Sequence, residues 1–164
     1  MFIFLYFGIA VLLIVVDQLT KWAFFGKSFS LIGDFLWIEG KSLNTGAAGG
    51  IFSGQMWLFI SLAIIVSAAI IYLLLTKKYS NSKFFKITLS VMLAGILGNF
   101  IDRIMFNGVR DFIYFKSINF YIFNFADIYL TIGAILLCVY MIFLHKDKVN
   151  NEEKIKSQEK DNNE

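Results

Sequence analysis

The sequence predicts an all-α membrane protein with four transmembrane helices. Of its 164 residues, 58% are hydrophobic, the mean hydropathy is +0.69, and only 16% are charged, whereas an ordinary soluble domain is about 25% charged. A soluble chain of this length could not bury so many apolar side chains, because much of its surface would still face water. We therefore expect residues 1–145 to form a single domain within a membrane.

The composition also excludes several kinds of site. Cys138 is the only cysteine, so the chain cannot build a disulfide framework. A zinc site of the cysteine and histidine type needs about four ligands, and the chain offers only Cys138 and His145. The net charge of +3 is too small to indicate a nucleic-acid partner. We expect no metal, no cofactor and no nucleic acid.

The first predicted helix covers about residues 2–25. Residues 1–16 are apolar but would span only about 24 Å as a helix, so we expect the helix to continue through Asp17 and Lys21. A cleaved signal peptide is the alternative interpretation. No basic residue precedes the apolar run and no small-residue cleavage site precedes Asp17, so a retained helix is favoured.

Three further segments are long and apolar enough to span a bilayer, which takes roughly 20 residues. Residues 55–76 form the clearest of them, with only two serines as polar groups in the centre. Residues 84–106 begin apolar and end in polar side chains, whereas residues 124–145 begin with polar side chains and then run apolar. The chain therefore crosses the membrane four times.

Lysines predict the orientation of these helices, because cytoplasmic loops are enriched in basic residues. The tail, residues 146–164, is mixed in charge and starts with lysines. We therefore expect both termini and this charged tail in the cytoplasm, and residues 26–54 and 107–123 on the outer side. The loop between the second and third helices has four lysines and no acid, and they are Lys77, Lys78, Lys83 and Lys86.

Polar side chains gather at the outward ends of three helices. Such groups are costly at membrane depth and are therefore candidate functional residues. Helical spacing places those of each helix on a shared face, so one site near the outer surface would gather all of them. The set consists of Asp17, Gln18 and Lys21 in the first helix, Asn99, Asp102 and Arg103 in the third, and Asn124 and Asp127 in the fourth.

A pair of carboxylates is the chemistry that this cluster favours. His145 and Cys138 would lie at the inward side, so neither can act there as base or nucleophile. Carboxylates alone could hold a hard cation, or two aspartates could share a proton, activate water and protonate a leaving amine. A proton-coupled transporter, which would want an acid near the midplane, and a membrane scaffold are the rival interpretations.

Elimination selects Asp111 and Asp127 as the candidate pair. Asp17 has a lysine one helical turn away and Asp102 has an arginine beside it, so we expect both to be structural. The helix dipole favours the ionised form of Asp127, and we therefore hypothesise that Asp127 tends to hold the charge and Asp111 the shared proton. Spacing alone leaves open that Asp127 only caps a helix behind Asn124 and that Asp111 is a loop residue.

Two further stretches each allow two interpretations. Residues 44–50 are rich in glycine but lack the Gly-Lys-Ser/Thr ending of a phosphate loop. They form either a tight turn or a place where the backbone approaches a substrate closely. Residues 106–125 are dense in aromatic side chains, which are typical of the membrane interface and would also suit the wall of a site for a lipid-bearing substrate.

Five short motifs lie in order along about residues 10–135. They are Asp17–Lys21 (D-Q-L-T-K), Asn44–Ala48 (N-T-G-A-A), Gly98–Arg103 (G-N-F-I-D-R), Val109–Phe112 (V-R-D-F) and Phe123–Asp127 (F-N-F-A-D). Together, in this order and at these separations, they resemble the motifs of bacterial lipoprotein signal peptidases (signal peptidase II). No single motif is diagnostic, but the five together are highly specific.

The resemblance implies a four-helix aspartyl endopeptidase of the bacterial cytoplasmic membrane, acting as a monomer with its active site near the outer face. Such an enzyme removes signal peptides from prolipoproteins and cleaves N-terminal to a cysteine that bears diacylglycerol. Its partners are therefore these substrates and membrane lipid. The resemblance also implies a small extracytoplasmic β-containing segment with a flexible loop, and we expect residues 26–54 to form something other than a hairpin.

The resemblance also implies a role for each matching residue. Asp111 and Asp127 would be the catalytic pair. Two positions depart from or vary within the family pattern: Gly49 stands where the family usually has Phe or Trp, and Arg110 fills a variable position. The residues that would support the site or face the substrate are Asn99, Arg103, Asn124, Asn44, Asp17, Lys21 and Asp102.

Overall fold

Four long helices dominate the computed structural model, which describes residues 3–41, 43–47, 50–76 and 82–145. All four are long and apolar enough to cross a membrane, which confirms the predicted fold class. The charged tail, Gly49 and the loop residues Lys77 and Lys78 lie outside the described residues. The helices are α1 (Ile3–Phe24), α2 (Met56–Leu75), α3 (Lys83–Phe106) and α4 (Phe125–Val139), and α4 continues as a π-helix over Tyr140–His145.

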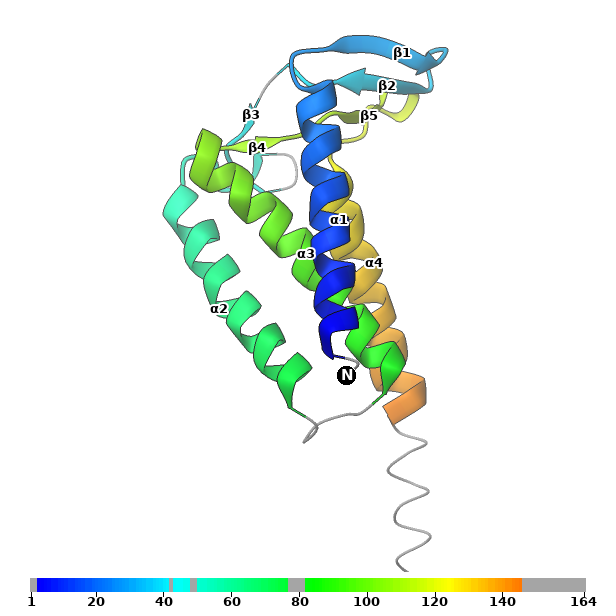
Figure 1. Ribbon diagram of the computed structural model, residues 1–164. Helices are drawn as coiled ribbons and strands as arrows, with labels where there is room; N and C mark the ends of the chain where they lie inside the picture. Colours follow the sequence, from blue (N-terminus) through cyan, green and yellow to red (C-terminus); the bar gives the residue numbers. More distant parts are fainter. Residues whose placement is uncertain (1–2, 42, 48–49, 77–81, 146–164) are drawn as a thin grey trace, which may run out of the picture.

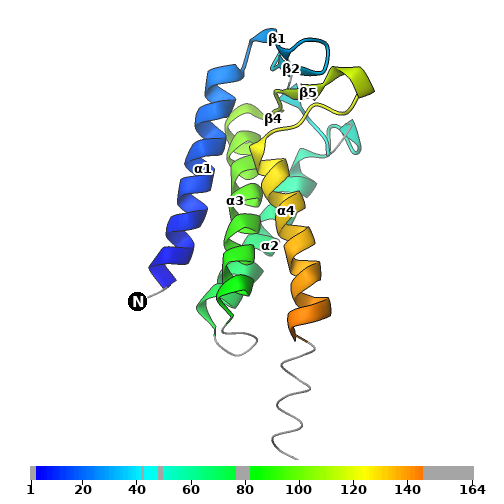
Figure 2. The ribbon, with the colours of Figure 1, turned by 90° about the vertical axis from the view of Figure 1, so that its right-hand side faces the viewer.

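Helix α3 lies at the centre of the bundle, between α1, α2 and α4 (Figures 1 and 2). Its sequence allows this because small residues let neighbouring helices approach. A methyl group added at Gly95 would come within 2.5 Å of the Ala126 carbonyl oxygen on α4, and one at Gly98 within 2.6 Å of an Asp17 carboxylate oxygen on α1. Large apolar side chains on α1 and α2, such as Phe4 and Ile65, are exposed, as expected for surfaces that face lipid.

Two small sheets sit together at the end of the bundle opposite the N-terminus (Figure 1). The first has the antiparallel order β1 (Ser28–Ile32), β2 (Leu36–Glu39), β5 (Ile113–Phe115), and the second pairs β3 (Leu43–Asn44) with β4 (Val109–Arg110). The β-containing segment implied by the resemblance is therefore present.

The segment over residues 26–54 does contain a hairpin, so the expectation that it forms something else is wrong in part. Strands β1 and β2 are joined by a tight turn at Gly33, whose φ of 46° lies in the left-handed region that glycine adopts readily. The same segment then supplies β3. Because β2 pairs with β5 and β3 pairs with β4, the backbone on both sides of Asp111 is fixed against residues 26–54.

Candidate active site

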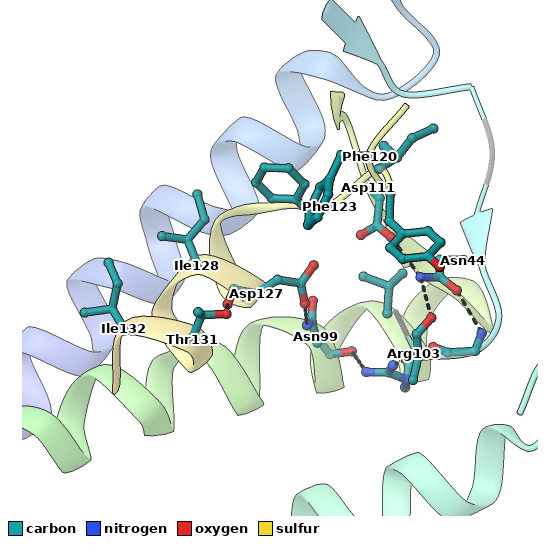
Figure 3. Close-up of a pocket in the computed structure, with 15 residues that line it drawn as sticks. Asn44, Asn99, Arg103, Asp111, Phe120, Phe123, Asp127, Ile128, Thr131 and Ile132 are labelled. Atoms are coloured by element: carbon teal, nitrogen blue, oxygen red, sulfur yellow. Dashed lines mark hydrogen bonds between the residues drawn. The ribbon is translucent and has the colours of Figure 1, made fainter. Parts of the chain in front are cut away.

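A pocket of about 380 Å³ opens where the second sheet meets α3 and α4. Asp111 directly follows β4 and Asp127 lies in the first turn of α4, and Figure 3 shows both carboxylates pointing into the same space. The structure therefore brings together the two aspartates that elimination selected. Other polar side chains in the lining include Asn44, Asn99, Arg103 and Thr131, and the apolar lining includes Phe120, Phe123, Ile128 and Ile132.

Asp127 is both a helix-capping residue and a pocket residue. The Asn124 side chain accepts a hydrogen bond from the backbone N–H of Asp127 at 3.0 Å, and the Asp127 carboxylate accepts one from the backbone N–H of Asn124 at 3.2 Å. This capping box starts α4 where the sequence suggested. The other carboxylate oxygen, Oδ1, accepts from Nδ2 of Asn99 at 2.7 Å. Capping therefore fixes the carboxylate without closing it off from the pocket.

Asp111 is held by two side-chain amides. Nδ2 of Asn44 donates to its Oδ2 at 2.9 Å, and Nδ2 of Asn124 donates to its Oδ1. The residue is only 5% exposed. Burial, together with the negative charge of Asp127, raises the pKa of Asp111 to about 7. A carboxyl group with this pKa is partly protonated near neutral pH.

The orientation of the Asn99 amide follows from the lysine behind it. The Lys21 ammonium can only donate, and it donates to Oδ1 of Asn99 at 2.9 Å. The same oxygen accepts from Nδ2 of Asn124 at 3.2 Å. The NH₂ group of Asn99 must therefore face Asp127. In this way Lys21, which is fully buried and does not line the pocket, acts on the site through Asn99.

Four charged side chains form a buried cluster beneath the pocket. Lys21 lies 2.8 Å from an oxygen of Asp17 and 3.7 Å from one of Asp102, and the Arg110 guanidinium lies 2.7 Å from Asp102. Two cations thus balance two carboxylates, as burial in a membrane requires. Asp17 also accepts from the backbone N–H of Ala126 at 2.9 Å, which ties α1 to the start of α4. Asp17 and Asp102 are each paired with a buried cation and are not among the residues that line the pocket.

The partner of Asp102 differs from the sequence-based expectation. Arg103 follows Asp102 on the same helix, but neighbouring helical side chains point about 100° apart, and Arg110 provides the ion pair instead. Arg103 turns toward the pocket, where it donates to the carbonyl oxygen of Gly46 at 3.1 Å and lies over the Phe59 ring. The sequence analysis did not predict Arg110 as the partner of Asp102.

Protein N–H groups surround the two carboxyl groups of the pocket. Each of the four carboxylate oxygens of Asp111 and Asp127 accepts an N–H from the protein. Among the described residues, no group of three or more His, Cys, Asp or Glu side chains could hold a metal. Two carboxyl groups that face one pocket could act together as a general acid and a general base.

Comparison with known proteins shows the family of this chain. The family model described as "Signal peptidase (SPase) II" matches residues 9–143. The chain belongs to the signal peptidase II family. All the motif residues named above, from Asp17 to Asp127, lie within the matched range.

Individual signal peptidase II relatives cover nearly the whole chain. The lipoprotein signal peptidase of Bacillus pumilus (strain SAFR-032) is 41% identical over 144 residues, covering 84% of this chain and 92% of the relative. That of Staphylococcus aureus (strain JH9) is 42% identical over 153 residues, covering 89% and 91%. A solved bacterial membrane enzyme, determined by the in meso method at 2.3 Å resolution, superimposes with a TM-score of 0.79 at 39% identity, covering 91% and 92%.

Family membership and the four apolar helices together make the protein a multi-pass bacterial membrane peptidase. The pocket described above contains an arrangement of side chains suited to peptide hydrolysis, because it holds paired carboxylates next to an apolar wall.

Proposed function

We propose that this signal peptidase II is an aspartyl endopeptidase that removes signal peptides from diacylglyceryl-modified prolipoproteins, cutting N-terminal to the lipidated cysteine. Its relatives carry the name lipoprotein signal peptidase, which supports the substrate class. The observation that carries the catalytic type is that Asp111 and Asp127 line one pocket and interact electrostatically, with each carboxylate fixed by asparagine amides.

In the proposed mechanism the two aspartates have different roles. Asp127, at the N-terminus of α4, is ionised and takes a proton from a water molecule that attacks the scissile carbonyl carbon. Asp111, which holds its proton to about pH 7, donates to the amide nitrogen as the C–N bond breaks. Arg103 lines the same pocket and keeps a positive charge near the developing negative charge.

The apolar wall of the pocket suits the lipid part of the substrate. Phe120 and Tyr121 come from the segment between η2 (Lys116–Ile118) and α4, and Ile128 and Ile132 come from one face of α4. Acyl chains could lie along these side chains and remain in the bilayer while the peptide stays near the carboxylates. Membrane lipid and lipidated prolipoprotein are therefore the proposed partners.

The proposed orientation places the pocket at the outer face of the bacterial cytoplasmic membrane and both termini in the cytoplasm. The two sheets and the pocket lie at one end of the bundle, and Lys83 and Lys86 lie at the start of α3, toward the other end. Basic residues favour the cytoplasmic side. We propose that the protein acts as a monomer.

Product mapping tests the substrate class. The purified protein in detergent is given two matched precursor peptides, one with diacylglycerol on the cysteine and one without. We expect mass spectrometry to find cleavage of the bond preceding the lipidated cysteine, and little or none in the unlipidated peptide. Equal cleavage of both peptides, or cleavage at another bond, would contradict the proposed specificity.

A further inference from the structure

Arg110 is a buried cation outside the proposed acid–base steps. Its guanidinium grips the Asp102 carboxylate with two parallel hydrogen bonds, Nε to Oδ2 at 3.1 Å and Nη2 to Oδ1 at 2.7 Å. Its backbone N–H also donates to Oδ2 of Asp102 at 2.9 Å. Forked pairs of this kind fix direction as well as distance, because the guanidinium is planar. The Arg110 side chain of β4 therefore binds Asp102 of α3 in one defined orientation.

The same guanidinium reaches a second helix. Nη2 of Arg110 donates to Oε1 of Gln18 on α1 at 2.9 Å, and the guanidinium carbon lies 4.3 Å from the centre of the Phe106 ring. The residue is 6% exposed. A buried charge that lost these partners would be costly, so the contacts hold β4 against both α1 and α3.

The contacts of Arg110 also restrict the next residue, Asp111. Strand β4 has only two residues and pairs with only two residues of β3, so its ladder alone is a weak constraint. In extended backbone, successive side chains point to opposite sides. With the Arg110 side chain fixed toward α1 and α3, the Asp111 side chain points the other way, into the pocket.

We propose that Arg110 is a positioning residue for Asp111, clamping β4 to Asp102 and Gln18 so that the Asp111 carboxylate meets Asp127 across the pocket. This inference rests on the proposed function, because it assumes that Asp111 acts in catalysis. A displacement of about 1 Å in a reacting group lowers turnover roughly 100-fold. Loss of the clamp therefore lowers kcat and leaves KM, which reports contacts made elsewhere in the pocket, nearly unchanged.

Three variants separate positioning from simple charge balance. In Arg110→Met the clamp is lost, and we expect kcat to fall by roughly 10- to 100-fold. Arg110→Lys keeps the positive charge but cannot form the two parallel hydrogen bonds to Asp102, so it should restore only part of the lost kcat. The double variant Asp102→Asn/Arg110→Gln removes one charge of each sign, so it should recover thermal stability but not kcat. Lys116→Gln, which breaks the exposed pair with Asp34, is the matched control and should behave as wild type.

The experiment measures kcat, KM and melting temperature for the full-length variants in detergent with the lipidated peptide, beside Asp111→Asn. A low kcat in the double variant despite wild-type stability supports the proposal. Recovery of kcat together with stability shows that Arg110 only balances charge and overturns it, as does a kcat of Arg110→Met within about threefold of wild type. If Asp111→Asn itself is active, the proposed function fails instead.

Discussion

Nδ2 of Asn99 donates a hydrogen bond to Oδ1 of Asp127 at 2.7 Å (Figure 3). Lys21 sets the direction of that bond, because it donates to the amide oxygen of Asn99. An asparagine amide can be turned either way, so its orientation in a site needs a cause. Here the ammonium of Lys21 takes the oxygen side, and only the NH₂ side is left for the carboxylate. Lys21 on α1 thus orients the Asn99 amide on α3, and that amide binds the Asp127 carboxylate on α4.

Asn99→Asp tests this arrangement with little change in shape. The new carboxylate still accepts from Lys21, but it presents an acceptor and a negative charge to Asp127 where a donor was. We expect kcat for the lipidated peptide to fall by roughly 100-fold or more, a loss comparable to removing one well-placed donor. Asn119→Asp is the control, because Asn119 is exposed and already accepts from the Tyr114 hydroxyl. Comparable activity of the two variants would argue against a role for the Asn99 donor.

The raised pKa of Asp111 predicts how activity and stability depend on pH. Folded Asp111 keeps its proton to about pH 7, whereas in the unfolded chain it loses it near the ordinary value of 3.8. Between these values the folded state binds more protons, so the Asp111 contribution to the free energy of unfolding decreases as pH rises. Cleavage should also decline as pH rises through about 7, because the proton donor is lost.

Asp111→Asn provides the corresponding measurement. Asparagine cannot titrate, so the melting temperature of this variant should gain on that of wild type between about pH 5 and about pH 8. Parallel melting temperatures over this range would show that Asp111 has an ordinary pKa in the folded protein.

Asp102→Asn should affect folding before it affects chemistry. Asp102 is fully buried between Lys21 and Arg110, and neutralising it leaves the cluster with an uncompensated positive charge. Breaking a buried pair in this way typically costs about 3–5 kcal/mol, so we expect a lower melting temperature and lower yield. Asp34→Asn, at an exposed pair, should change neither. A stable but inactive Asp102→Asn variant would instead place Asp102 in the chemistry.

Gly98→Ala tests the close approach of α1 to α3. The added methyl group would lie 2.6 Å from Oδ2 of Asp17 and 3.2 Å from the Ala126 side chain. Overpacking of this kind costs about 1–3 kcal/mol, and here it also displaces the buried Asp17–Lys21 pair. Gly8→Ala is the control, because nothing lies within 4 Å of the added group and alanine favours a helix. Equal melting temperatures for the two variants would show that α1 can shift freely.

The helices and the catalytic candidates could be predicted from the sequence because each depends on local physics. Long apolar runs require spanning helices, and Asn124 with Asp127 has the spacing of a capping box, which the structure contains. The choice of Asp111 followed from removing aspartates that had a cation nearby. The structure places both remaining aspartates in one pocket, although Arg110, and not Arg103, is the cation that pairs with Asp102.

The interactions that sequence reasoning missed all join distant segments. Arg110 reaches Asp102 and Gln18 only because the chain folds back after α3, and Asn44 reaches Asp111 only because β3 pairs with β4. Spacing along one helix cannot show these contacts. The β1–β2 hairpin is a local element, but its second strand also pairs with the distant strand β5, and the sequence of residues 26–54 alone cannot show that pairing.

The central claim is that Asp111 and Asp127 act together in catalysis, and the most direct measurement is cleavage of the lipidated precursor peptide by Asp111→Asn and Asp127→Asn. Both changes preserve size, and the buried Asp17, Lys21, Asp102 and Arg110 cluster stays intact, so we expect both variants to insert and fold. Each should be inactive at every pH tested, with substrate binding retained. Substantial cleavage by either folded variant would contradict the claim.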